Sequence, residues 1–114
     1  MLTKTLQELM EDLSEWQTNT FPNQTAVGKS YHLQKEIKEL IEALELVEKE
    51  PTIENITKLT KEIADCQMLI MAVTLKLGFG SYDLLHFTQS KLEINKLRKW
   101  QEPDENGACQ HVEE

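Results

Sequence analysis

The chain has few of the residues that define several common classes of protein. Its 114 residues include only two cysteines, Cys66 and Cys109, which lie far apart in sequence and outside any CxxC pair. This excludes a disulfide framework and zinc-finger spacing. Lysine and arginine number 12 against 20 acidic residues, for a formal net charge of −8. Because nucleic-acid affinity rests on basic patches, this balance argues against a nucleic-acid partner.

Long apolar runs are also missing. The N-terminal sequence MLTKTLQELMEDL is amphipathic and acidic, and it lacks the apolar stretch of a signal peptide. The longest apolar run, residues 63–77, is interrupted by Asp65, Gln67, Thr74 and Lys76, so it is too short and too polar to span a bilayer. We therefore expect a cytoplasmic protein with no membrane partner.

What the sequence does contain is helical periodicity. Four apolar-periodic segments, separated by loops around Pro22, Pro51 and Gly78, predict helices at about 3–17, 24–49, 53–77 and 81–100. No strand pattern and no Gly-rich phosphate loop occur. We expect one all-α domain over residues 1–114, in which residues 101–114 form a polar C-terminal extension.

The third predicted helix carries information about assembly. Its second half is apolar on nearly every side, and a helix of that kind is buried on every side. A hydrophobic content of 39% is modest for a small chain that must cover such a helix alone. The sequence therefore predicts a four-helix bundle completed by oligomerisation, as a homodimer or homotetramer.

Two acidic pairs on the second and third predicted helices are the main candidates for chemistry. Glu36 and Glu39 lie three residues apart, as do Glu62 and Asp65, so each pair presents two carboxylates side by side on a helix. An antiparallel hairpin about Pro51 would bring all four together. Four oxygen donors of this kind can hold Mg²⁺, and Mg²⁺ with carboxylates commonly serves the hydrolysis of nucleotide polyphosphates.

Solvated acids are the alternative interpretation, because ExxE pairs recur at Glu8/Glu11 and Glu42/Glu45. The apolar stripe of the second helix distinguishes the pairs, and it comprises Leu33, Ile37, Leu40, Ile41, Leu44 and Val47. Glu36 falls at the edge of this stripe and Glu39 one step further out. Glu62 and Asp65 share a face with Cys66. Acids against an apolar face are costly unless they are paired or bound to metal.

Other residues are candidates for binding a substrate. Lys91, Asn95 and Arg98 share one helix face, which suits phosphate oxygens, although an ordinary basic stripe near a helix C-terminus has the same pattern. Trp16 stands beside the loop TNTFPNQT and is either a stacking surface for a base or a core residue. His32 lies one turn before Glu36 and either faces the site or lies on the surface.

Taken together, these segments resemble the all-α nucleoside triphosphate pyrophosphohydrolases, the MazG-like superfamily. Within it, the sequence is similar to the small phage-type dATP/dGTP diphosphohydrolase-like family. The resemblance covers residues 16–112 and runs through EWQTNTFP, HLQKEIKEL, EIADCQMLI, KLEINKLRKW and a PDENG segment followed by His111. The order and spacing ExxE…ExxD…KxxxNxxRxW are specific, whereas no single part is.

The resemblance implies metal ligands at Glu36, Glu39, Glu62 and Asp65, with Mg²⁺ as the cofactor and Mn²⁺ as the other candidate. It implies phosphate contacts from the basic residues Lys91 and Arg98 and from Asn95. The implied activity converts a deoxynucleoside triphosphate, dATP or dGTP, to monophosphate and pyrophosphate. Glu39, with Glu36, is our candidate for orienting or deprotonating the attacking water. Better-known members carry a further Glu where this chain has Lys35, which bears on the number of metal ions.

Three other interpretations compete with this one. A non-catalytic helical interaction module would place its acids on the solvent face alone. A carboxylate-bridged di-iron bundle needs Glu-x-x-His pairs on two helices, but the chain offers only Asp83-x-x-His86. A nucleic-acid binder that uses KLRKW is disfavoured by the net charge.

Overall fold

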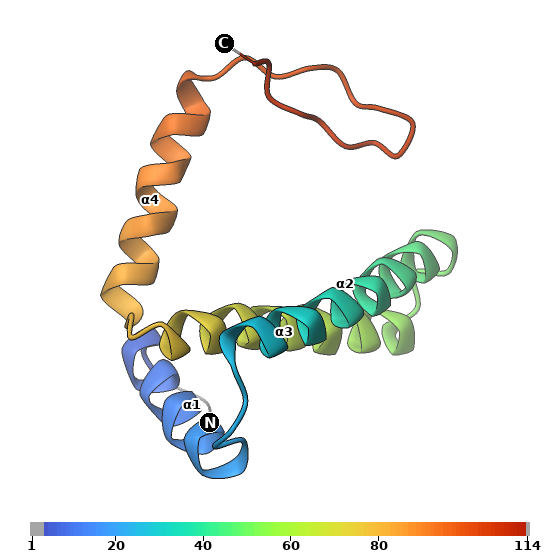
Figure 1. The fold of residues 1–114 in the computed structure, drawn as a ribbon. Coiled ribbons are helices and arrows are strands. Elements are labelled where there is room, and N and C mark those ends of the chain that lie inside the picture. Colours follow the sequence, from blue (N-terminus) through green and yellow to red (C-terminus); the bar gives the residue numbers. More distant parts are fainter. Residues whose placement is uncertain (1–3, 114) are drawn as a thin grey trace. The chain divides into compact units, whose positions relative to one another are not determined.

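The fold is entirely helical, as the sequence predicts (Figure 1). The computed structural model describes residues 4–113 and contains α1 (Leu6–Thr20), α2 (Ala26–Lys49), α3 (Ile53–Lys76) and α4 (Ser81–Leu97). Within those residues the only β-type pairing is an isolated antiparallel bridge between Trp100 and His111. The chain divides into two compact units, and the boundary in the sequence lies between Tyr82 and Asp83.

In the first unit, α2 and α3 form a hairpin and lie side by side along their lengths (Figure 1). The turn between them is fixed by side chains. Thr52, the N-cap of α3, accepts a hydrogen bond from the backbone N–H of Asn55 at 3.1 Å. The Asn55 side chain donates in turn to the carbonyl of Glu50 at 2.9 Å. Because both hydrogen bonds tie the turn to one residue, Asn55, the register of the two helices is well defined.

Helix α1 begins and ends three residues later than the predicted range 3–17. Its start is set by a capping box in which Thr5 and Glu8 exchange hydrogen bonds, and these bonds lower the pKa of Glu8. At the other end, the N–H of Phe21 still donates to the carbonyl of Gln17 at 2.8 Å. The polar residues 18–20 therefore stay helical, and the chain leaves the helix only beside Pro22.

The core of the first unit is small. α1 packs against α3, and the buried apolar side chains are Met10, Leu13, Cys66, Met71 and Ala72. The outer half of the predicted α2 stripe, Ile37, Ile41 and Leu44, is at least 41% exposed. On α3 a second apolar stripe, Ile56, Ile63 and Ile70, repeats every seven residues and is at least 43% exposed. A single copy of the chain thus leaves two apolar helix faces open to solvent.

The backbone requires a glycine just after the end of α3. Gly78 has φ +87°, a left-handed conformation that disfavours residues with a Cβ. This lets the N–H of Phe79 turn back to the carbonyl of Thr74 at 3.1 Å. No single helix within residues 4–113 has both the length and the hydropathy of a membrane span. Among these residues, only α3 and α4 taken as one bent pair reach those values.

In the second unit, α4 ends at Leu97, three residues before the predicted end at Trp100. Trp100 instead pairs with His111, so the predicted polar extension folds back on itself. Backbone N–H groups of Gln101 and Val112 donate to carbonyls across this pairing, at 2.8 and 2.7 Å. The Asp104 carboxylate closes the turn by accepting two backbone N–H bonds.

Candidate metal centre

Three of the four predicted acids converge where α2 faces α3. Glu36 on α2 and Glu62 and Asp65 on α3 each present a carboxylate oxygen, and these oxygens lie within 4.8 Å of one another. All three side chains are half-buried. The i, i+3 spacing on α3 places its two acids on the face that meets α2, and the capped turn aligns Glu36 with them.

The fourth acid, Glu39, is exposed and lies outside this trio, but it interacts with Glu36. Hydrogen bonding to the Glu39 carboxyl is the main reason that the pKa of Glu36 is raised. Burial and the negative charges of Glu39 and Asp65 act in the same direction. His32 opposes them through a 3.2 Å contact between its Nε2 and Oε1 of Glu36. The cluster therefore carries more negative charge than its surroundings stabilise.

Two buried oxygens of the cluster have no hydrogen-bond partner in the described part of the chain. Among residues 4–113, Glu36 Oε2 and Glu62 Oε2 are buried and unpaired. Cys66, buried next to the acids, has its thiol pKa raised by burial and then by the four carboxylates. Buried oxygens without donors are costly, whereas a divalent cation would satisfy them. Hard carboxylate oxygens at this spacing suit Mg²⁺ or Mn²⁺, so the donor set fits such an ion.

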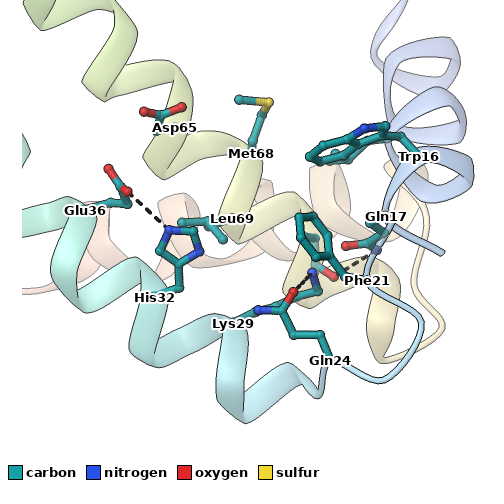
Figure 2. Close-up of a pocket in the computed structure, with 12 residues that line it drawn as sticks. Trp16, Gln17, Phe21, Gln24, Lys29, His32, Glu36, Asp65, Met68 and Leu69 are labelled. Atoms are coloured by element: carbon teal, nitrogen blue, oxygen red, sulfur yellow. Dashed lines mark hydrogen bonds and ion pairs between the residues drawn. The ribbon is translucent and has the colours of Figure 1, made fainter. Parts of the chain in front are cut away.

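A cavity of about 400 Å³ opens beside the acids. Figure 2 shows Glu36, Asp65 and His32 at one end and Trp16, Gln17, Phe21, Gln24 and Lys29 at the other. The rings of Trp16 and Phe21 meet edge to face with centroids 5.3 Å apart. The remaining wall is apolar and includes Met68 and Leu69. Of the predicted site residues, Trp16 and His32 thus line the same cavity as two of the acids.

The predicted phosphate-binding residues belong to the second unit. Lys91 is exposed on α4, and Asn95 and Arg98 are half-buried, with Arg98 one residue past the helix. The carbonyl of Asn95 accepts bonds from the backbone N–H of Arg98 at 3.2 Å and from Trp100 Nε1 at 3.1 Å. The side-chain Oδ1 of Asn95 is buried and has no partner among the described residues.

Two cavity residues were missed from the sequence. Gln17 and Lys29 are 4% and 3% exposed, which is unusual for their types. A signal was present, because Gln17 continues the spacing of Met10 and Leu13 on the buried face of α1. Lys29 lies one turn before Leu33, on the α2 face that meets α3.

The fold is all-α, and these acids form a carboxylate cluster whose donor set fits a divalent cation. The model of the dATP/dGTP pyrophosphohydrolase family matches residues 9–114, and the chain belongs to this family. It is therefore a nucleoside triphosphate pyrophosphohydrolase, a hydrolase that acts on phosphoric anhydrides. No protein among the curated sequences matches.

One similar solved structure is the cyanophage S-2L MazG-like pyrophosphohydrolase bound to dGDP and three catalytic Mn²⁺ ions per active site. It is 26% identical, with a TM-score of 0.70, and the match covers 97% of this chain and 100% of that one. The resemblance to MazG-like proteins drawn from the sequence motifs is thereby confirmed.

Proposed function

We propose that the protein converts a purine deoxynucleoside triphosphate, dATP or dGTP, to the monophosphate and pyrophosphate with Mg²⁺ as cofactor. The convergence of Glu36, Glu62 and Asp65 carries this proposal. The family and the dGDP-bound structure support the nucleotide, and the oxygen donor set supports the cation. Mn²⁺, the ion of the similar structure, is the alternative cofactor.

Each group of residues has a distinct role in the proposed reaction. Glu36, Glu39, Glu62 and Asp65 hold the cations, which when bound neutralise phosphate charge and acidify water. Glu39, exposed and in contact with Glu36, orients or deprotonates the water that breaks the α–β anhydride. Lys91, Asn95 and Arg98 bind phosphate oxygens. Trp16 and His32 contact the nucleoside from the cavity wall.

The reaction class is tested by its products. Purified protein with Mg²⁺ is expected to release one pyrophosphate for each dATP or dGTP consumed, and chelation of the metal should stop the reaction. Chromatography of the nucleotide products and a direct pyrophosphate assay, across all common nucleotides, measure this. Formation of a nucleoside diphosphate and orthophosphate, or no turnover of any nucleotide, would contradict the proposal.

We also propose that the enzyme is a homodimer or a dimer of dimers. The apolar stripes Ile37/Ile41/Leu44 and Ile56/Ile63/Ile70 are more exposed than stable monomers usually allow, and a second copy is a chemically matched cover. Light scattering at micromolar concentration is expected to give at least twice the 13.2 kDa chain mass. Ile41→Lys should lower that mass, whereas Glu42→Lys, away from the stripe, should not. A monomeric wild type would refute the proposed assembly.

A further inference from the structure

The cavity beside the acids has a polar end that the proposed catalytic residues do not use. Glu36 and Asp65 line one side, where a bound cation would hold phosphates, and Gln17, Gln24 and Lys29 line the other (Figure 2). The volume of about 400 Å³ lies within the range of small-ligand sites. A nucleoside with its phosphates at the acids would place its base towards the polar end.

Gln17 presents an unsatisfied acceptor in this wall. Its side-chain Nε2 lies 3.5 Å from the carbonyl oxygen of Ala72 and donates to it. Its Oε1 is buried and has no hydrogen-bond partner within residues 4–113. Reversing the amide would set its oxygen against the Ala72 carbonyl, so the contact holds Oε1 in its present direction. A buried acceptor held in place without a donor is disfavoured unless a ligand supplies that donor.

Lys29 presents a donor at the same end. Its Nζ donates to Gln24 Oε1 at 2.9 Å and lies 5.3 Å from the centroid of the Phe21 ring. Within residues 4–113, no carboxylate is within ion-pair distance of this ammonium group. Burial, followed by the charge of Lys76, lowers the pKa of Lys29. An ammonium group has three N–H donors, so capacity remains for a neutral acceptor on a ligand.

We propose that Gln17 and Lys29 are the residues that read the purine base, an inference that rests on the proposed function. Gln17 Oε1 accepts an N–H of the base, and Lys29 Nζ donates to the neighbouring ring or carbonyl acceptor. In adenine these are the 6-amino group and N1, and in guanine they are N1–H and O6. Because the donor and the acceptor stand in opposite order along the two base edges, guanine binds turned over relative to adenine. In these two orientations the same two side chains accommodate both purines, beside the rings of Trp16 and Phe21.

Removing the base donor tests the role of Gln17. The triphosphate of 2′-deoxynebularine is dATP without its 6-amino group. For the wild type, kcat/KM for this analogue is expected to be about 10 to 100 times lower than for dATP, because Gln17 Oε1 is then left unpaired. For Gln17→Leu, kcat/KM for dATP should fall by a similar factor, and the two substrates should differ less than about threefold. This is a double-mutant cycle between the side chain and the base.

Matched variants separate base reading from folding. Gln7→Leu makes the same change on the exposed face of α1 and should leave the preference for dATP intact. Lys29→Met should lower kcat/KM for dATP while keeping the preference for the 6-amino group. The wild-type comparison of the two substrates needs no variant, so equal kcat/KM values would refute the role of Gln17 even if Gln17→Leu does not fold. Equilibrium binding of the two monophosphates should show the same preference without turnover.

The two proposals fail differently. If the wild type hydrolyses no nucleoside triphosphate, the proposed function is wrong. If it hydrolyses dATP and the deoxynebularine analogue with equal kcat/KM, the enzyme stands and the base-reading role of Gln17 is refuted. The same conclusion follows if Gln17→Leu folds and keeps the full preference of the wild type.

Discussion

Asp65→Asn is expected to lower turnover at least about a hundredfold while leaving the metal-free protein as stable as the wild type or more so. Oxygens of Glu36, Glu62 and Asp65 lie within 4.8 Å of one another, so without metal their charges repel. The substitution removes one charge from this group and keeps the side-chain shape. It also removes a proposed metal ligand, so added Mg²⁺ should stabilise the variant less than the wild type.

The pH dependence of the metal-free protein follows from Glu36. Its pKa is raised in the folded state, first by the hydrogen bond with Glu39, then by burial and by the charges of Glu39 and Asp65. The folded state therefore binds more protons than the unfolded one. This contribution to stability is fully present below the unfolded pKa of about 4.3 and is lost as pH rises through the raised folded pKa. In Asp65→Asn the loss should be smaller, because one cause of the shift is gone.

Thermal melts of both proteins between pH 4 and 8, with and without Mg²⁺, measure these effects. Glu45→Gln removes an exposed acid from α2 and serves as the control that should change neither stability nor the response to Mg²⁺. A clearly lower melting temperature for metal-free Asp65→Asn, together with an equal response of all three proteins to Mg²⁺, would show that the acids are not one metal centre.

Lys91→Ala and Arg98→Ala are each expected to lower kcat/KM about 10- to 100-fold without unfolding the protein. Lys91 is exposed, and the backbone at Arg98 is held by its own N–H bond to Asn95, so neither truncation removes a structural contact of the main chain. Charge-assisted hydrogen bonds to phosphate are among the stronger polar contacts, and their loss should raise KM and slow turnover. Steady-state kinetics over several nucleotides should show a similar loss for each, because phosphate contacts do not depend on the base.

Lys38→Ala is the matched control for these two variants. Lys38 is an exposed lysine of α2 whose removal changes the net charge by the same amount as Lys91→Ala. It should leave kcat/KM near the wild-type value. An equal loss in Lys38→Ala would mean that the kinetic effect reflects bulk charge and not a phosphate site.

The sequence predicts the helices best where a side chain caps them. Thr52 marks the start of α3 correctly, and Gly78 follows its end. The predicted range 3–17 begins and ends three residues before α1, although the T-x-x-E sequence at Thr5 and Glu8 is typical of a helix start at Leu6. The end of α4 could not be predicted, because it depends on the pairing of Trp100 with His111, a contact that no local pattern encodes.

The convergence of three acids between α2 and α3 also follows from the sequence. Glu36, Glu62 and Asp65 are separable from other acids by their position against apolar stripes. The sequence does not predict that Glu36 is half-buried while Glu39 is exposed. Burial on one side of a helix hairpin depends on how closely α2 approaches α3. The sequence does not predict the burial of Gln17 and Lys29, because a polar residue on an apolar helix face usually marks the edge of that face.

The turn at Glu50–Asn55 sets the dimensions of a site far from it. Glu36 precedes Glu50 by fourteen residues, about 21 Å of helix at 1.5 Å per residue. Both helices of the hairpin meet at this turn, so the hydrogen bond from Asn55 to Glu50 fixes the register of α2 against α3 along that length. Adding one residue to α2 between Glu36 and Glu50 would rotate Glu36 by about 100° relative to the turn, which would carry it off the face that it shares with Glu62 and Asp65. The number of helical residues between the turn and the acids is therefore as important to the candidate metal centre as the acids themselves.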